Sequence, residues 1–143
     1  MIRKILLMTV SIMLVFSVCG TALAGELPLE ASDSGGDYSI RYTYISYTSC
    51  NFAIASDGKA SMSASISGYS NVDSVKISGY LQRYNGGWQT VKSWSETTPG
   101  RYGIMSKTWY VSQGYQYRWL VYYYAYSGSN VESTSDAIYR NFY

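Results

Sequence analysis

The sequence contains no histidine among its 143 residues, and this absence excludes several kinds of site. It rules out histidine-based acid–base catalysis, the Ser/His/Asp and Cys/His nucleophilic arrangements, and zinc sites with imidazole ligands. Charged residues are also scarce, at 14% of the chain against 47% hydrophobic residues. This balance excludes a generally disordered chain rich in charge of one sign. What the chain has in abundance is tyrosine, with 17 residues.

Residues 1–24 have the pattern of a cleaved secretory signal peptide. They begin with two basic residues, continue with an apolar run over residues 5–18, and end in a small-x-small cleavage site at residues 22–24. A membrane anchor fits less well, because the apolar run is short and the cleavage site follows directly. A lipoprotein signal at Cys19 also fits less well, since the bulky Val18 precedes the cysteine. We therefore expect a secreted, extracellular protein.

Cleavage would change the charge of the chain. Two of the 11 basic residues leave and all nine acidic residues stay, so the mature chain would carry no net charge. Four of the acids lie in residues 25–37, whose proline and paired glycines predict a flexible acidic leader. Residues 38–143 would form the folded domain, with nine basic and five acidic residues. This mild excess forms no basic cluster, so we expect no nucleic-acid partner.

The folded domain is predicted to be all-β. No segment of residues 38–143 shows a convincing helical period. Short runs rich in Val, Ile, Thr, Tyr and Trp alternate with turn signals, for example at residues 57–58, 85–87 and 99–100. This spacing is typical of an antiparallel sandwich or barrel.

The clearest predicted strand pair surrounds the turn at Gly58. Apolar residues alternate with small or polar ones over residues 50–54 and 60–66, which predicts one buried face and one serine-lined wet face. A two-residue turn would put the two apolar sets on opposite faces, so we expect a three-residue loop, 56–58, with Gly58 left-handed. Cys50 would then point into the core as an inert small hydrophobe. The alternatives for a lone secreted cysteine are a free thiol and a disulfide between chains.

A second hairpin is predicted from residues 75–84 and 88–94, joined by a turn at residues 85–87. The residues that suit its inward face are Val75, Ile77, Leu81 and Val91. The residues of opposite parity, expected on the outward face, include Lys76, Tyr80, Gln82, Tyr84, Trp88, Thr90, Lys92 and Trp94. Tyr84 and Trp88 would face each other across the strands as an aromatic pair.

The segment 115–126 is predicted to be a strand with two aromatic faces. Its odd positions suit a core, while its even positions include Tyr122, Tyr124 and Tyr126. Such a strand is either covered on both faces or exposes an aromatic strip. Its start resembles the tyrosine-corner strand of immunoglobulin-like sandwiches, with Tyr117 as the first corner candidate and Tyr115 as the second. We therefore expect an immunoglobulin-like antiparallel β-sandwich.

A series of short motifs runs in order along residues 38–143. They are IRYTYI at 40–45, GYS at 68–70, LQ at 81–82 before Trp88, VKSWS at 91–95, SKT at 106–108, GYQYR at 114–118 and AYSGS at 125–129. Together they resemble an uncharacterised family of small secreted proteins from Gram-positive, clostridial-type bacteria, a domain of unknown function. The resemblance implies a secreted sandwich, and it carries no activity, substrate or catalytic residues.

The chain departs from this family pattern in two places. The resemblance implies a second cysteine near Met62, across the hairpin from Cys50, and this chain lacks it. The pattern also has Thr or Lys at the outer positions of the 115–126 strand, where this chain has Leu120, Tyr122 and Tyr124. A function specific to this chain would therefore reside on that face.

Catalysis finds little support in the sequence. The acids of the predicted domain are Asp57, Asp73, Glu96, Glu132 and Asp136, and no motif singles out a pair of them. The chain also lacks a phosphate-binding glycine loop, a nucleophile elbow and a calcium loop. We therefore expect no enzyme and no catalytic, cofactor-binding or metal-binding residues.

Surface binding is favoured instead, because exposed aromatic rings suit stacking against sugar rings or apolar protein patches. The candidate binding face consists of two strips, Tyr80, Tyr84, Trp88 and Trp94 on the second hairpin and Tyr122, Tyr124 and Tyr126 on the 115–126 strand. Packing in the core is the competing interpretation for each strip. The expected partner is a cell-surface glycan or protein. The alternative function is a secreted membrane-active or antimicrobial factor, which the serine-rich hairpin at residues 50–67 permits.

Overall fold

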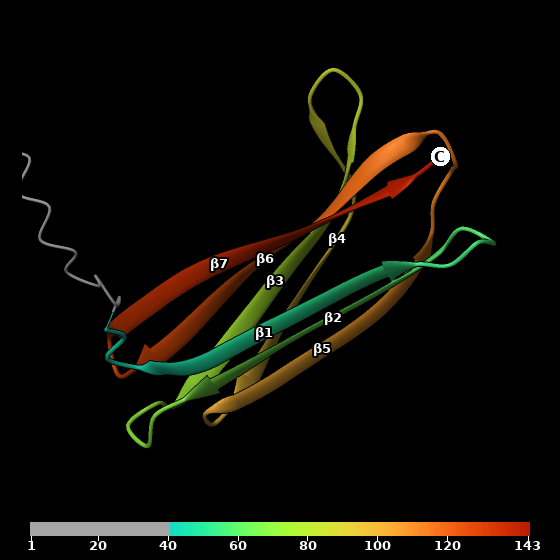
Figure 1. The fold of residues 1–143 in the computed structure, drawn as a ribbon. Coiled ribbons are helices and arrows are strands. Elements are labelled where there is room, and N and C mark those ends of the chain that lie inside the picture. Colours follow the sequence, from blue (N-terminus) through green and yellow to red (C-terminus); the bar gives the residue numbers. More distant parts are fainter. Residues whose placement is uncertain (1–40) are drawn as a thin grey trace, which may run out of the picture. The chain divides into compact units, whose positions relative to one another are not determined.

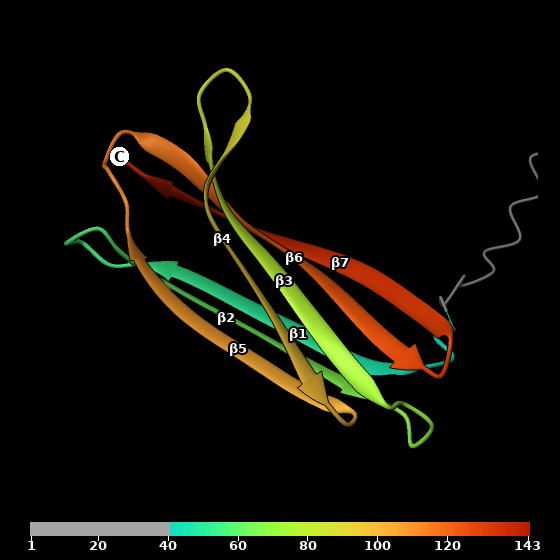
Figure 2. The ribbon, with the colours of Figure 1, turned by 180° about the vertical axis from the view of Figure 1, so that it is seen from behind.

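The computed structural model describes residues 41–143, which form two antiparallel β-sheets packed face to face (Figure 1). The first sheet has the strand order β1-β2-β5, with β1 at Ile45–Ile54, β2 at Lys59–Gly68 and β5 at Tyr102–Tyr110. The second has the order β4-β3-β6-β7, with β3 at Ser74–Tyr84, β4 at Trp88–Pro99, β6 at Tyr115–Ser127 and β7 at Asn130–Phe142. Figure 2 shows these four strands in that order from behind. The predicted all-β sandwich is confirmed.

Two predicted segments lie outside the described residues. They are the signal peptide at residues 1–24 and the acidic leader at residues 25–37. Within the described part of the chain, no helix is long and apolar enough to cross a membrane.

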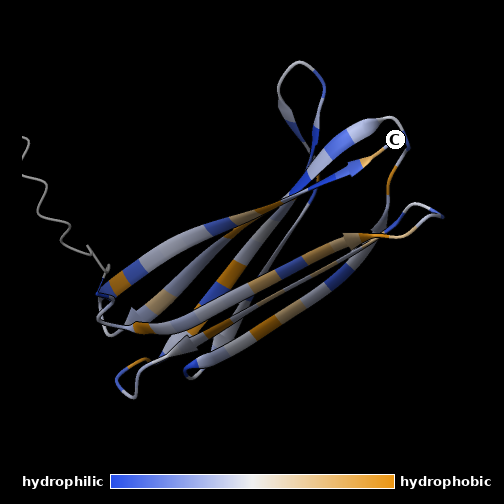
Figure 3. Ribbon diagram, viewed as in Figure 1, coloured by the Kyte–Doolittle hydropathy of each residue, from blue (hydrophilic) through white to orange (hydrophobic). Residues whose placement is uncertain are grey.

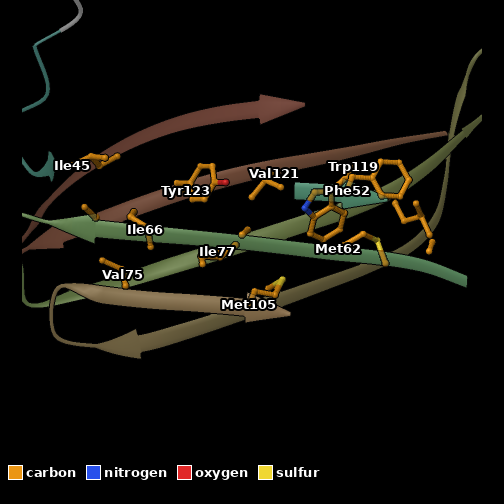
Figure 4. Packing of buried hydrophobic residues seen from close by; sticks show 14 of the residues in the cluster. Ile45, Phe52, Met62, Ile66, Val75, Ile77, Met105, Trp119, Val121 and Tyr123 are labelled. Atoms are coloured by element: carbon orange, nitrogen blue, oxygen red, sulfur yellow. The ribbon is translucent and has the colours of Figure 1, made fainter. Parts of the chain in front are cut away.

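The core lies between the two sheets. Every second residue of a strand points inward, and the inward side chains of the two sheets meet there. Figure 3 shows the resulting alternation of hydrophobic and hydrophilic positions along the strands. Phe52, Met62, Trp119 and Tyr123 are buried among the aliphatic side chains of this core (Figure 4). Because most inward positions of the central strands β2, β3 and β6 are apolar, burial of this layer supplies the main driving force for folding.

The first hairpin forms as predicted. Phe52 pairs with Met62 and Ile54 with Ala60, so the apolar positions of β1 and β2 share the inner face. Beyond the last paired residues of the two strands, the Ala55 N–H donates a 3.0 Å hydrogen bond to the Lys59 carbonyl, and this bond closes a loop of three residues, 56–58. Gly58 has a φ of 83°, the left-handed conformation that this loop requires.

The second hairpin also forms, but its return strand contains a β-bulge. Leu81 pairs with Lys92, whereas Gln82 pairs with Thr90, so Val91 is an extra residue in β4. The prediction that Val91 faces inward is therefore wrong, and its side chain is 39% exposed. Val75, Ile77 and Leu81 do face the core, as the sequence predicted.

The bulge reverses the facing of the rest of β4. Lys92 and Trp94 pair with Leu81 and Gly79 at inward positions of β3, so they point toward the other sheet. Trp94 packs against the core, with its ring 5.9 Å from that of Trp119. The prediction that Lys92 and Trp94 share the outward face with Tyr80 is therefore wrong, because one inserted residue changes the parity of all that follow.

The strand β6 begins with the contact that the sequence predicted for Tyr117. Its side chain is buried, and its hydroxyl donates a 2.7 Å hydrogen bond to the carbonyl of Ser112, five residues upstream. This bond ties the segment before β6 to the start of the strand. Because the hydroxyl would otherwise be buried without a partner, the bond also removes an energetic penalty.

The start of the described chain is held against β7 by one carboxylate. Glu132 accepts hydrogen bonds from the backbone N–H groups of Thr43, Tyr44 and Ile45 at 2.7–2.8 Å. Burial alone would raise the pKa of Glu132, but these three donors hold it below its usual value. The carboxylate thus fastens the segment before β1 to an edge strand of the other sheet.

We expect the Glu132→Gln variant to lose about 1 kcal/mol of unfolding free energy at neutral pH, since a neutral amide accepts these bonds less strongly. The loss should shrink on acidification. Above the ordinary glutamate pKa of about 4.3 the carboxylate is ionised in both states, and below it the unfolded chain takes up the proton first. Urea denaturation from neutral to acidic pH measures the effect, with Glu96→Gln as control, whose carboxylate instead pairs with Lys107. A loss independent of pH would contradict this account.

Candidate functional site

The outward side of the β4-β3-β6-β7 sheet, here called the outer face, gathers most of the predicted binding residues. Cross-strand pairing places Tyr80 beside Leu120, Lys76 beside Tyr124 and Tyr84 beside Gln116 on β3 and β6. The predicted residues on this face are Tyr80, Tyr84, Trp88, Tyr122, Tyr124 and Tyr126. Because β3 and β6 are neighbours in the sheet, the two predicted strips form one continuous surface. Trp94 is not part of it.

The aromatic rings of the outer face pack against one another while remaining partly accessible. Tyr80 and Tyr122 meet edge to face, with ring centres 5.9 Å apart. Tyr124 and Tyr126 are stacked at 6.5 Å, with 21° between their planes. Tyr122 is 37% exposed, and Tyr80, Tyr124 and Tyr126 are half-buried. The competing interpretation, in which these tyrosines pack in the core, is therefore wrong.

One end of the face carries a second aromatic group centred on Trp88. Its ring lies 5.3 Å from that of Tyr84, which confirms the predicted pair across the hairpin. It also lies 5.6 Å from the ring of Tyr139, which β7 contributes. The guanidinium carbon of Arg118 stands 4.4 Å from the Trp88 ring centre, a cation–π contact. Residues from all four strands therefore build this end of the face.

A shallow depression of about 350 Å³ lies between the two aromatic groups. The side chains that line it are Tyr80, Gln82, Thr90, Leu120, Tyr122 and Tyr124. Three tyrosine rings and a leucine supply the apolar part of the lining, while the tyrosine hydroxyls, an amide and a threonine hydroxyl supply hydrogen-bonding groups. This combination of flat apolar rings with a few oriented polar atoms is typical of small-ligand and carbohydrate-sized sites.

The polar groups of the depression are already oriented by one another. The Arg118 Nε donates a 2.6 Å hydrogen bond to the Gln82 Oε1, and the Gln82 Nε2 donates a 3.0 Å bond to the Thr90 Oγ1. The chain of bonds crosses β6, β3 and β4. It fixes the rotamer of Gln82 and the plane of the guanidinium, so less side-chain entropy is lost when a ligand binds.

The outer face is positively charged. Lys76 and Arg118 occupy outward positions of β3 and β6. The register instead places Glu96, Glu132 and Asp136 at inward positions of the edge strands β4 and β7, and Asp57 and Asp73 lie in turns. Within residues 41–143, no carboxylate therefore lies on this face.

Sequence reasoning missed two contributions to the site. Tyr139 was not assigned to a face, because β7 mixes polar and apolar residues without a clear alternation. Its pairing with Arg118 brings it onto the outer face beside Trp88. The hydrogen-bonded chain of Arg118, Gln82 and Thr90 joins residues up to 36 positions apart, and no local pattern announces it.

A second hollow, of about 250 Å³, lies on the outward side of the β1-β2-β5 sheet. Its lining is made mostly of serine, threonine and asparagine side chains, among them Asn51, Ser61, Ser63 and Thr108. No aromatic ring lines it. It therefore offers hydrogen bonds without a stacking surface, and it is the weaker candidate.

Cys50 lies at the edge of the core on β1, facing inward as predicted but half-buried. Its thiol donates a 3.3 Å hydrogen bond to the Asp136 carboxylate on β7. Burial, followed by this hydrogen bond and the negative charge of Asp136, raises the pKa of the thiol to about 11. The nearby Tyr123 hydroxyl donates to the carbonyl of Ser49 at 2.9 Å.

The described residues offer no metal-binding cluster, since no three His, Cys, Asp or Glu side chains of residues 41–143 gather closely enough to hold an ion. Comparison of the chain with models of protein families, with curated proteins and with solved structures finds no match. The geometry of the outer face is therefore the basis on which a function can be assigned.

Proposed function

We propose that this protein is a secreted, non-catalytic, immunoglobulin-like β-sandwich that binds a glycan through its outer face. The observation that carries the proposal is the convergence of six predicted aromatic residues, together with Tyr139, on one sheet face around a depression of about 350 Å³. Sugar rings have apolar faces and hydroxyl rims, which match tyrosine rings and an oriented amide.

The immunoglobulin-like assignment is supported by topology and by one side chain. The strand order β1-β2-β5 over β4-β3-β6-β7 places the fifth strand beside the second and the sixth beside the third. This is the crossed arrangement of Greek-key sandwiches in which the fourth strand joins the sheet of the third. The Tyr117 hydroxyl bond to Ser112 supplies the corner contact of that class.

A glycan suits the outer face better than a large protein surface does. The tyrosine hydroxyls, Gln82 and Thr90 distribute polar atoms among the rings, so the hydroxyl groups of a sugar would find hydrogen-bonding partners beside each apolar ring face. The hollow is shallow, and β3, β4 and β6 all contribute to its lining, so it is open to a chain of sugar rings. Secretion, which the first 24 residues predict, would bring this face to extracellular glycans.

The test is retention of the mature protein on a glycan array and on cell-wall fractions. Tyr122→Ala and Tyr80→Ala, which remove rings from the depression, are each expected to weaken binding about tenfold, the loss of one good stacking contact. Tyr110→Ala is the matched control, because Tyr110 is 67% exposed and lies on the opposite sheet. Its affinity should equal that of the unaltered protein.

Three outcomes would overturn the proposal. The first is the absence of retention on every glycan and wall fraction. The second is release of a trapped dye from liposomes by the unaltered protein together with the absence of glycan retention, which would support a membrane-active factor instead. If Tyr110→Ala and Tyr122→Ala weaken glycan binding equally, the outer face is not the binding site.

A further inference from the structure

We infer that the ligand of the outer face is an acidic polysaccharide, a chain of sugar rings that carry carboxylate groups. This inference rests on the proposed function and narrows it to one class of glycan. Its basis is the charge of the face, the geometry of its cations and the distance between them.

The two cations of the outer face have no carboxylate beside them. The Lys76 Nζ lies over the ring of Tyr124, 5.7 Å from its centre, and Arg118 is bonded to a neutral amide. The register keeps Glu96, Glu132 and Asp136 off this face. A ligand carboxylate would therefore meet positive charge without a competing internal partner.

Arg118 is shaped to receive a carboxylate. Its Nε donates to Gln82, and the carbon of its guanidinium group lies over the Trp88 ring, 4.4 Å from the ring centre. The terminal nitrogens are not engaged by these two contacts. A planar guanidinium held in this way presents a fork that matches the two oxygens of a carboxylate, and little rotamer freedom is lost on binding.

The spacing of the cations calls for a chain rather than a single sugar. Arg118 pairs with Gln82, which lies six residues from Lys76 along β3, so the backbone positions that carry the two cations are about 20 Å apart at about 3.3 Å per residue. Tyr80, Leu120 and Tyr122 and the depression lie between them. A bound chain would therefore place charged groups at both ends of the site and apolar ring faces over the middle.

Three polymers separate what negative charge and sugar rings on the ligand each contribute to binding. Polygalacturonate has both, fully methyl-esterified polygalacturonate has the rings without the charge, and inorganic polyphosphate has the charge without the rings. We expect polygalacturonate to bind at least about tenfold more tightly than either of the others at low salt. Its binding should weaken as the salt concentration rises from about 0.05 M to about 0.5 M, because exposed charges are then screened.

Two variants locate the effect. Lys76→Gln and Arg118→Gln should each reduce the preference for the acidic over the esterified polymer by about threefold to tenfold, while Lys59→Gln, on the opposite sheet, should leave it unchanged. Circular dichroism of each variant checks that the fold is retained. For a variant that does not fold, the salt dependence of the unaltered protein still tests the role of charge.

The outcomes distinguish this inference from the proposed function. Equal binding of the acidic and esterified polymers would overturn the inference and leave a neutral glycan as ligand. If the protein is retained by a neutral glycan on the array and does not bind polygalacturonate, the inference is also overturned and the ligand is a neutral glycan. Binding of polyphosphate as tight as that of polygalacturonate would show charge alone at work and would overturn both. Failure of every glycan would also overturn both.

Discussion

The Gly79→Ala variant is expected to unfold with a free energy lower by about 3 kcal/mol than that of the unaltered protein. Gly79 lies in the middle of β3, between Trp94 on β4 and Val121 on β6. A Cβ atom added there would overlap the six-membered ring of Trp119. The glycine is therefore required by close packing and not by its backbone conformation.

The reason for this large effect is that Trp119 cannot easily move away. Its side chain is fully buried, its ring edge meets Trp94, and its Nε1 donates a 3.3 Å hydrogen bond to the Ser63 carbonyl on the other sheet. The ring thus spans the space between the sheets directly above Gly79. Relief of the overlap would displace a side chain that both sheets hold, so the strain spreads through the core.

Urea denaturation measures this effect, and Gly87→Ala is the matched control. Gly87 has no atom within 4 Å of the position of an added Cβ, and it does not adopt a positive φ. We expect the control to change the unfolding free energy by less than about 0.5 kcal/mol. The double variant Gly79→Ala/Trp119→Phe should cost less than the sum of its single substitutions, because the smaller ring makes room for the methyl group. Equal effects of Gly79→Ala and Gly87→Ala would contradict this picture of the core.

The thiol of Cys50 is expected to react with iodoacetamide about 100-fold more slowly than an unperturbed cysteine near pH 8, since a pKa of about 11 leaves about one hundredth of the usual thiolate. Burial is the main cause, and the Asp136 carboxylate adds to it. Asp136→Asn should therefore make the alkylation of Cys50 faster, but the rate should remain below that of an unperturbed cysteine. The same protonated state disfavours disulfide exchange between chains.

The pH profile of alkylation is the decisive measurement. The rate for Cys50 should still rise steeply above pH 10, where the rate for an exposed cysteine has already levelled off. The double variant Cys50→Ser/Ser70→Cys supplies this control, because Ser70 is exposed in the turn after β2. A Cys50 profile that levels off together with the control would show an accessible thiol and refute the account of Cys50 at the core edge.

Much of the fold could be predicted because its signals are local. The alternation over β1 and β2, the turn residues and the parity argument together anticipated both the three-residue loop and the left-handed Gly58. The inward positions of β3 and β6 were likewise anticipated by period-two patterns. The Tyr117 contact followed from a short motif at the start of its strand.

The errors arose where one residue changed a pattern. The bulge at Val91 inserts a single position into β4, and this insertion turns Trp94 from the expected outward strip into the core. Polar and apolar residues are mixed along β4, so no break in alternation marked the insertion. The bulge depends on how β4 pairs with β3 and on the packing of Trp94 against Trp119. These contacts involve residues far from Val91 in the chain, so the sequence around Val91 does not predict the bulge.

The sequence by itself determined that the chain forms an antiparallel sandwich, since alternation and turn chemistry act between neighbours in the chain. It also determined that β6 has aromatic residues on both faces, but it left open which of them reach solvent. Only the tertiary structure decided that, by covering one face of β6 with the other sheet. The pairing of β6 with β3 and β7 then united Tyr80, Tyr122, Tyr139 and Arg118 in one surface. Contacts between residues far apart in the chain have no local signature, so the binding face exists only in the folded protein.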